Sequence, residues 1–278
     1  MPVRTVVSKQ NARLKDLRRA LANPGRGRDG SILIAIEGPI LIAEALRANM
    51  KIDSVFAAQG AEKLLAPLSL PPDTEILLVP RELLDSALTT ETPQPIAALV
   101  EPHRWTWKQV IAPRPSQPQL LLVLAGLQDP GNLGTILRSA EAFGATGVIS
   151  LPGTVSEWNP KTLRAAAGSV FRLPIVHGVL SMLQHLRAMG VQILAATAHS
   201  GQPANAVDLT QPIALLIGNE GHGLPADLAA RADNAITIPC PGPVESLNAA
   251  MAATTLLYEA ARQRSSAIPH QNAKRGTR

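Results

Sequence analysis

A strand–turn–helix–strand pattern between Leu120 and Leu151 sets the fold class of this chain. Residues 120–127 form an apolar run with the length and aliphatic content of a buried strand. The turn sequence Asp129-Pro130-Gly131-Asn132 ends this run. An amphipathic helical pattern then leads to Gly144, a typical helix-ending glycine, and to a second strand at residues 147–151. This βαβ unit predicts an α/β fold with a parallel sheet, in which ligands usually bind near the strand-to-helix turns.

The segments on both sides of this unit predict two domains. Residues 1–102 alternate strands (31–36, 52–57, 76–79, 96–100) with helices (8–21, 39–49, 61–65, 81–87), which is typical of a small α/β domain. We expect Ser8 to cap the first of these helices. Residues 119–263 add strands at 191–196, 213–217 and 236–238 and helices at 161–170, 179–189 and 247–262. They therefore form the second domain.

Two segments fall outside these domains. Residues 103–118 are rich in proline and include Trp105 and Trp107, which predicts a stiff linker whose tryptophans pack on one domain. Residues 264–278 carry basic and polar side chains with no apolar periodicity, and we expect a disordered tail there.

The composition indicates a globular protein of the cytoplasm. Hydrophobic residues make up 46% of the 278 residues, yet no apolar segment approaches the roughly 20 residues that span a bilayer. The N-terminus is basic but lacks the apolar region of a secretory signal. A single cysteine, Cys240, excludes an intramolecular disulfide and a cysteine-based zinc cluster, which suits a reducing compartment.

The net charge of +5 is concentrated near the N-terminus and in the C-terminal tail. Before residue 29 a single acid, Asp16, stands against eight basic residues: Arg4, Lys9, Arg13, Lys15, Arg18, Arg19, Arg26 and Arg28. Such segments can bind the phosphates of a nucleic acid, or they can be a solvated helix face and a tail. Charge alone leaves these two interpretations equally supported.

Three loops at the ends of predicted strands carry polar groups: residues 129–138, 218–224 and 239–248. None is a phosphate loop of the Walker type, because no Gly-Lys-Ser or Gly-Lys-Thr follows the glycines. The glycines of the second loop have the spacing GxxGxG, which differs from the dinucleotide fingerprint. A nicotinamide-dependent oxidoreductase is therefore disfavoured.

Taken together, the three loops resemble the signature motifs of the SpoU (TrmH) family of RNA 2′-O-ribose methyltransferases, within the SPOUT superfamily. The segments are DPGNLGTILRSAEAFG, LLIGNEGHGLP and IPCPGPVESLNAAMAATTLLYE, in the family's order, and NPKTLRAAAGSVFRLPIV resembles the segment after the first motif. Three spaced motifs in order are far more specific than one. In the N-terminal part, EGPILIAEAL and TPQPIAALV resemble an L30e-like substrate-binding domain.

The resemblance implies a SPOUT-type parallel sheet with a trefoil knot, preceded by the small L30e-like α/β domain. It also implies S-adenosyl-L-methionine as methyl donor, RNA as substrate and a homodimer whose active site takes residues from both subunits. The two-domain layout favours 23S ribosomal RNA. Transfer RNA is an alternative substrate, and a non-catalytic RNA-binding factor of ribosome assembly is an alternative function. The chain has all five polar residues of the motifs, which argues against a non-catalytic assembly factor.

The resemblance assigns roles to these five residues: Asn132, Arg138, Glu220, Ser246 and Asn248. Arg138 would be the catalytic arginine, which we expect to clamp a phosphate and stabilise the developing alkoxide, because a guanidinium hardly deprotonates. Asn132 would orient the hydroxyl and cap its helix, and Glu220 would hold the loop or Arg138. Ser246 and Asn248 begin the last helix, where free amides suit a polar ligand and Ser246 could serve as cap.

The cofactor pocket implied by the resemblance would be lined by Ala196, Thr197, Gly218, Ile238 and Leu247, largely through backbone groups. His222 could act as a base, but an exposed loop histidine is favoured over that role. Four alanines, at positions 249, 250, 252 and 253, are expected to form a packing face. Methyl transfer from a sulfonium needs no metal, and the sequence offers no obvious set of metal ligands. Aromatic residues make up only 3% of the chain, so we expect phosphate and 2′-hydroxyl contacts to dominate RNA binding.

Overall fold

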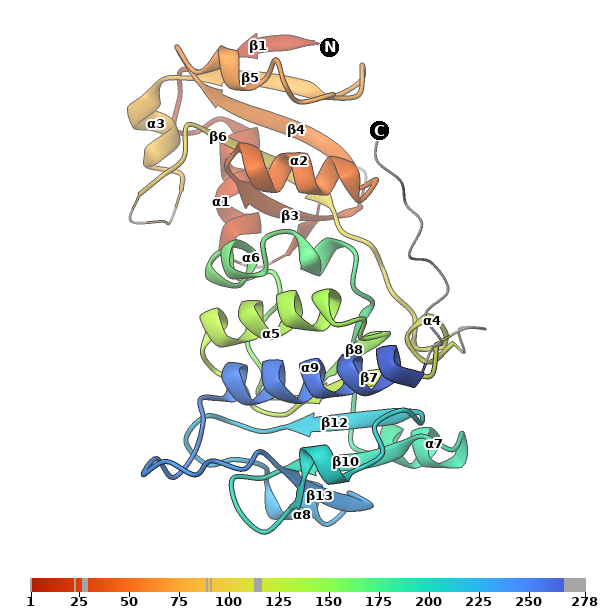
Figure 1. Cartoon of the computed structure of the whole chain (residues 1–278). Coiled ribbons are helices and arrows are strands. Elements are labelled where there is room, and N and C mark those ends of the chain that lie inside the picture. Colours follow the sequence, from red (N-terminus) through yellow and green to blue (C-terminus); the bar gives the residue numbers. More distant parts are fainter. Residues whose placement is uncertain are drawn as a thin grey trace, which may run out of the picture. The chain divides into compact units, whose positions relative to one another are not determined.

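The computed structural model describes residues 2–22, 24–26, 30–88, 90, 92–112 and 117–267. The chain divides into two compact units (Figure 1). The first contains residues 1–104, 133–138 and 156–172, and the second contains residues 105–132, 139–155 and 173–278. The predicted tail is described only as far as residue 267, so most of it lies outside the described residues.

The first unit is built on a six-stranded mixed sheet with the order β1-β5-β4-β6-β3-β2. β1, β5 and β4 are mutually parallel, whereas β6, β3 and β2 each run antiparallel to the strand before them in this order. The strands are β1 (Val3–Thr5), β2 (Gly25–Arg26), β3 (Ile32–Glu37), β4 (Lys51–Ala58), β5 (Glu75–Val79) and β6 (Ile96–Glu101). Its helices include α1 (Ala12–Ala22), α2 (Pro39–Arg47), α3 (Arg81–Asp85) and the 3₁₀ turn η1 (Glu62–Leu64).

The first helix begins later than the sequence pattern predicted. Asn11, not Ser8, caps α1, because its Oδ1 accepts the backbone N–H of Arg13 at 2.9 Å. The Ser8 hydroxyl accepts the N–H of Gln10 at 3.2 Å and so closes a separate turn before the helix. Leu14, Leu17 and Leu21 point into the core of the unit, as their spacing predicted.

The second unit is built on a seven-stranded sheet with the order β11-β13-β10-β12-β7-β8-β9. All of its strand pairs are parallel, so the predicted parallel sheet is confirmed. The strands are β7 (Leu120–Leu124), β8 (Gly147–Ser150), β9 (Ile175–His177), β10 (Gln192–Ala196), β11 (Gln202–Pro203), β12 (Ile213–Ile217) and β13 (Asn234–Thr237). β7 and β12 are buried along their whole length, as their continuous apolar runs require of central parallel strands.

Two long helices pack together through residues of the second unit, although residues 133–138 of one of them group with the first unit. α9 (Ala249–Ala267) runs next to α5 (Pro130–Ala142) in Figure 1. The hydroxyls of Ser139 and Thr254 lie 2.7 Å apart, and the rings of Phe143 and Tyr258 meet edge-on at 5.8 Å. The shorter helices are α4 (Trp107–Ile111), α7 (Met182–Ala188), α8 (Ala226–Ala229) and the 3₁₀ turn η3 (Ala204–Ala206).

The segment predicted as a proline-stiffened linker contains a helix. Thr106 and Gln109 form a capping box at the start of α4, and Val110 is fully buried. Trp105 and Trp107 pack against the core of the second unit, so these tryptophans have one domain as their partner. The proposed domain boundaries stay a prediction, and residues 113–116 of the linker lie outside the described residues.

Most other predicted elements are present with shifted ends, whereas the short elements β1, β2, β11, η3 and α8 were not predicted. The segment expected as one helix at 161–170 is α6 (Pro160–Ala166) followed by the 3₁₀ turn η2 (Ser169–Phe171), because Ala167 and Gly168 adopt positive φ values of 49° and 90°. Both elements group with the first unit. Within the described part of the chain, none of the helices has the length and apolar character needed to cross a bilayer.

Candidate functional site

The turn after β7 places Asn132 in the first turn of α5. Asp129 caps this helix by accepting the N–H of Asn132 at 2.8 Å, and Pro130 occupies the first helical position. The prediction that Asn132 itself caps the helix is therefore wrong. With Asp129 as cap, the Asn132 side chain is available for other partners.

Hydrogen bonds join one residue from each of the three sequence motifs. Asn132 Nδ2 donates to Glu220 Oε1 at 3.0 Å, and Asn248 Nδ2 donates to Asn132 Oδ1 at 3.1 Å. Asn132 is 88 residues from Glu220 and 116 residues from Asn248 along the chain, so only the fold brings them together. Both ends of the Asn132 amide are engaged, which fixes its orientation.

The loop between β12 and α8 is a tight turn organised by Asn219. Backbone bonds at 2.9 Å run in both directions between Asn219 and Gly223. The Asn219 amide donates to Gly126 O at 2.7 Å and accepts the N–H groups of Gly221 and His222 at 2.8 and 3.2 Å. A Cβ at Gly218 would overlap the backbone of Gly223 and lie 2.5 Å from Leu224 N, so this position needs glycine.

The start of α9 forms the third part of the site. Asn248 caps the helix, since its Oδ1 accepts the N–H groups of Ala250 and Met251 at 2.9 and 3.4 Å. The alternative that Ser246 serves as the cap is therefore wrong. Ala250 and Ala253 are buried as predicted, whereas Ala249 and Ala252 line a pocket instead of contributing to the same packing face.

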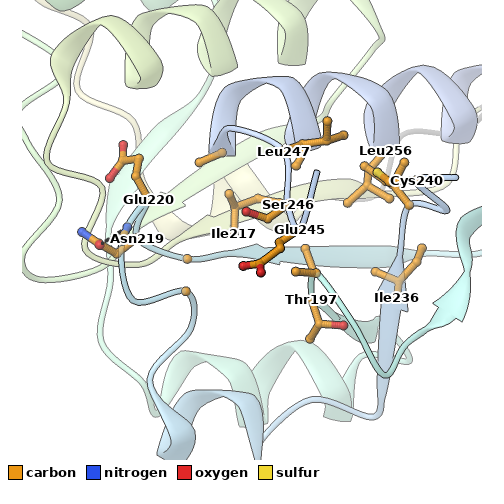
Figure 2. A pocket seen from close by; sticks show the side chains of 18 residues that line it. Thr197, Ile217, Asn219, Glu220, Ile236, Cys240, Glu245, Ser246, Leu247 and Leu256 are labelled. Carbon is orange, nitrogen blue, oxygen red and sulfur yellow. Dashed lines mark hydrogen bonds between the residues drawn. The ribbon is translucent and has the colours of Figure 1, made fainter. Parts of the chain in front are cut away.

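This pocket lies in the second unit and has a volume of about 280 Å³, near the lower end of the range for small-molecule sites. All five residues expected to bind a cofactor line it: Ala196, Thr197, Gly218, Ile238 and Leu247. Glu220 and Ser246 line it as well. Figure 2 shows Asn219 and Glu220 at one end, Ile236, Cys240 and Leu256 at the other, and Glu245 and Ser246 between them.

The pocket combines apolar walls with negative charge. Ile217, Ile236 and Leu256 are buried side chains that can contact the faces of an aromatic base. The charged groups that line the pocket are the carboxylates of Glu220 and Glu245, and no lining residue is Lys, Arg or His. This set suits an adenosyl ligand with positive charge and disfavours one that carries phosphates.

A buried hydroxyl adds to this description. Thr197 Oγ1 is shielded from solvent and, within the part of the chain that the structure describes, has no hydrogen-bond partner. The Thr197 backbone N–H donates to Ile236 O at 2.9 Å, where β10 meets β13. The pocket wall therefore retains a polar group with unused hydrogen-bonding capacity.

Neither Arg138 nor His222 lines the pocket. Arg138 is exposed on α5 and forms no hydrogen bond or ion pair with another described residue. Glu220 accepts from Asn132 rather than from Arg138. His222 is exposed at the tip of its loop, as favoured from the sequence.

Three polar residues of the pocket lining were not identified from the sequence: Asn219, Cys240 and Glu245. The turn-forming character of an asparagine directly after a glycine could have identified Asn219. Nothing in the sequence indicated which way Glu245 or Cys240 would point. Among the described residues, no group of three or more His, Cys, Asp or Glu side chains is arranged to hold a metal ion.

Two protein-family models match the chain and together cover most of it. The model of the SpoU rRNA Methylase family matches residues 119–258, which include the strands, loops and helix of the pocket. A second model, the MRM3-like substrate binding domain, matches residues 11–98 in the first unit.

Similar proteins cover nearly the whole chain. The 23S rRNA (guanosine(2553)-2′-O)-methyltransferase RlmP of Bacillus subtilis is 32% identical over 257 residues, which cover 92% of this chain and 98% of that protein. The 23S rRNA (uridine(2479)-2′-O)-methyltransferase of Streptomyces viridochromogenes is 32% identical over 284 residues, covering 95% and 94%. The crystal structure of the SpoU methyltransferase AviRb from Streptomyces viridochromogenes in complex with AdoMet has a TM-score of 0.79 at 31% identity, covering 92% and 99%. The predicted resemblance is thus confirmed, and the chain belongs to the SpoU rRNA methylase family.

Proposed function

We propose that this protein transfers a methyl group from S-adenosyl-L-methionine to a ribose 2′-hydroxyl of RNA, with 23S ribosomal RNA as the favoured substrate. The observation that carries the proposal is the joining of Asn132, Glu220 and Asn248 by hydrogen bonds beside an adenosyl-sized, anionic pocket. The relatives named above act on 23S rRNA, which supports the choice of substrate.

The pocket residues would hold the methyl donor. Ala196, Thr197 and Gly218 contribute the ends of β10 and β12, while Ile238 and Leu247 contribute the last loop. The apolar walls would contact the adenine base and the carboxylates would face the cationic part of the donor. When bound, the donor supplies an electrophilic methyl group on a sulfonium, so in-line attack by an oxygen needs no metal.

The polar side chains would position and activate the ribose. Asn132 and Asn248 offer an oriented pair of amides, and Ser246 lines the same pocket. The exposed guanidinium of Arg138 would clamp an RNA phosphate and stabilise negative charge that develops on the 2′-oxygen. When the C–O bond forms and the S–C bond breaks, the hydroxyl proton must pass to an acceptor. These side chains would orient the hydroxyl for that proton transfer and would not themselves be the acceptor.

We further propose that the protein acts as a homodimer with a trefoil knot in its second unit, and that it works in the cytoplasm. Support for the dimer comes from α9, where Met251 and Tyr258 are 58% and 54% exposed. Such an apolar stripe on a helix next to the site suits contact with a second copy. An exposed Cys240 thiol suits a reducing compartment.

The test is methyl transfer from labelled S-adenosylmethionine to separate pools of ribosomal RNA, assembling ribosomal particles and transfer RNA, followed by mapping of the modified ribose. We expect label in one ribose of 23S rRNA. Arg138→Ala should reduce transfer at least 100-fold while calorimetry still detects donor binding. Labelling of transfer RNA alone would contradict the favoured substrate. Donor binding without methylation of any pool would favour an RNA-binding assembly factor.

A further inference from the structure

Glu245 is one of the two carboxylates that line the pocket, and the proposed function does not distinguish its part from that of Glu220. It lies in the irregular loop between β13 and α9 and lines the pocket next to Ser246. Figure 2 shows its carboxylate in the middle of the site, away from Glu220. In the part of the chain that the structure describes, this carboxylate forms no hydrogen bond or ion pair.

We propose that Glu245 makes the pocket distinguish S-adenosylmethionine from S-adenosylhomocysteine by charge, so that it favours donor binding and product release. This inference rests on the proposed function and names a specificity-determining residue for it. Two observations carry it: Glu245 has no partner within the described protein, and the lining of the pocket contains no cationic side chain.

Glu220 cannot fill this role to the same degree. One of its carboxylate oxygens accepts the Asn132 amide at 3.0 Å, which holds that side chain toward the hydrogen-bonded trio. Glu245 is the other carboxylate of the lining and is not held in this way. It is therefore the carboxylate that is free to face a bound cation.

The charge of the ligand changes during the reaction. On methyl transfer the 2′-oxygen would form a bond to the methyl carbon while its proton passes to an acceptor. The S–C bond would break, and sulfur would keep the electron pair as a neutral thioether. The net charge of the ligand thus falls from +1 to zero. A partly solvated carboxylate near the sulfonium would change the relative affinity of the two ligands by roughly 3- to 10-fold.

A role in shape alone would have a different signature. If Glu245 only holds the loop, a substitution there weakens the binding of every adenosyl ligand by a similar factor. If it acts by charge, only cationic ligands lose affinity. Sinefungin separates these cases, because it replaces the sulfonium with a carbon that carries a protonated amine and cannot transfer a methyl group.

The experiment is calorimetric titration of the full chain with S-adenosylmethionine, sinefungin and S-adenosylhomocysteine. For Glu245→Gln we expect roughly 3- to 10-fold weaker binding of the first two and less than about 2-fold change for the third. Glu245→Asp should retain the preference, and 0.5 M salt should reduce the difference between wild type and Glu245→Gln. Asp227→Asn is the matched control, because it makes the same charge change at an exposed residue of α8 outside the pocket.

Equal weakening of all three ligands, or no change for any of them, would overturn the assignment of charge discrimination to Glu245. Binding of S-adenosylhomocysteine by the variant also shows that the pocket is intact. If the wild-type protein binds none of the three ligands, the proposed function fails. If the wild type binds them and Glu245→Gln weakens all three equally or none of them, the role of Glu245 is wrong and the proposed function stands.

Discussion

Asn132 is hydrogen-bonded to one residue from each of the other two motifs. Its amide nitrogen donates to Glu220 and its amide oxygen accepts from Asn248, so a rotated or altered amide cannot satisfy both neighbours. The side chain is half-buried, and the bonds are worth more there than at a fully exposed position. Asn132 thus sets the direction of every hydrogen bond in the group.

Replacing Asn132 with Asp tests this arrangement with almost no change of shape. The new carboxylate would still accept from Asn248 but would face the carboxylate of Glu220. We expect kcat/KM for methyl transfer to fall about 10- to 100-fold, equivalent to the loss of one hydrogen bond plus charge repulsion. Asn205→Asp, at an exposed site in η3, is the control and should leave kcat/KM unchanged. Equal activity of the two variants would show that the orientation of the Asn132 amide is unimportant.

Arg264 holds the end of α9 against the body of the second unit. Its guanidinium donates to the carbonyl oxygens of Pro118 and Gln119 at 2.6 and 3.0 Å. It also donates to those of Leu209 and Gln211 at 2.9 and 2.8 Å. Burial lowers the pKa of Arg264, but the group remains charged at neutral pH.

Arg264→Lys should therefore destabilise the protein although the charge is kept. An ammonium cannot reach four carbonyl oxygens in the geometry of a planar guanidinium, and some would be left unpaired. We expect the free energy of unfolding, measured by urea denaturation, to fall by roughly 2 kcal/mol. Arg262→Lys is the matched control, because Arg262 is exposed and pairs with Glu259, and its effect on the free energy of unfolding should be much smaller than that of Arg264→Lys. Similar losses in both variants would contradict the anchoring role.

At the scale of elements, apolar periodicity predicted most of the helices and strands and failed mainly at their ends. The central strands β7 and β12 and the helix α5 were predicted because burial imposes a pattern on many residues at once. The cap of α1 was misassigned, because Ser8 and Asn11 are both capable caps and local hydrogen bonds decide between them. Helix α4 was missed because its five residues are too few to show a period.

The sequence predicted some residues of the candidate site and missed others. The motif residues Asn132, Glu220 and Asn248 were found through the family resemblance, and the structure brings them together. Asn219 and Glu245 were missed, because a residue's contribution to a loop depends on where its side chain points. That direction is fixed by the return of the chain at Gly223 and by the course of the last loop, and the sequence pattern records neither.

The exposed face of α9 offers a test of the proposed dimer. Met251 and Tyr258 lie two turns apart on the helix and are both largely exposed. Met251→Glu would place a charge in a contact between copies while leaving the fold of one copy intact. We expect sedimentation velocity to show a dissociation constant at least 10-fold higher. Met189→Glu, at a 42% exposed methionine beyond α7, should not change it. A monomeric wild-type protein would contradict the dimer.

At the scale of the whole molecule, two groups stand out among the basic residues near the N-terminus. Arg13 is buried and pairs with Asp53 and Glu75 at 3.0 and 2.7 Å, and Arg4 also pairs with Glu75. Arg13 stabilises the first unit and is not available to RNA, whereas the Arg4 side chain stays largely exposed beside its partner. The charge count of this segment therefore overstates its capacity to bind phosphates.

Lys9 and Lys15 form the second group and are the better candidates for RNA contact. Both are exposed, and neither forms an ion pair with another residue of the described ranges. They lie in or beside the region that matches a substrate binding domain. Their lack of an internal partner leaves both charges free to replace counterions on a nucleic acid.

The double variant Lys9→Glu/Lys15→Glu should weaken RNA binding about 10-fold or more at low salt and leave the calorimetric affinity for S-adenosylmethionine unchanged. If both lysines contact phosphates, the slope of log K against log salt should become shallower by roughly 1.4–1.8. Lys63→Glu/Lys108→Glu makes the same change of net charge at other exposed lysines and separates local contact from long-range attraction. Equal losses in the two double variants would mean that RNA responds to total charge. A selective loss in the first variant, together with the shallower slope, would place a phosphate contact on α1 or the residues just before it.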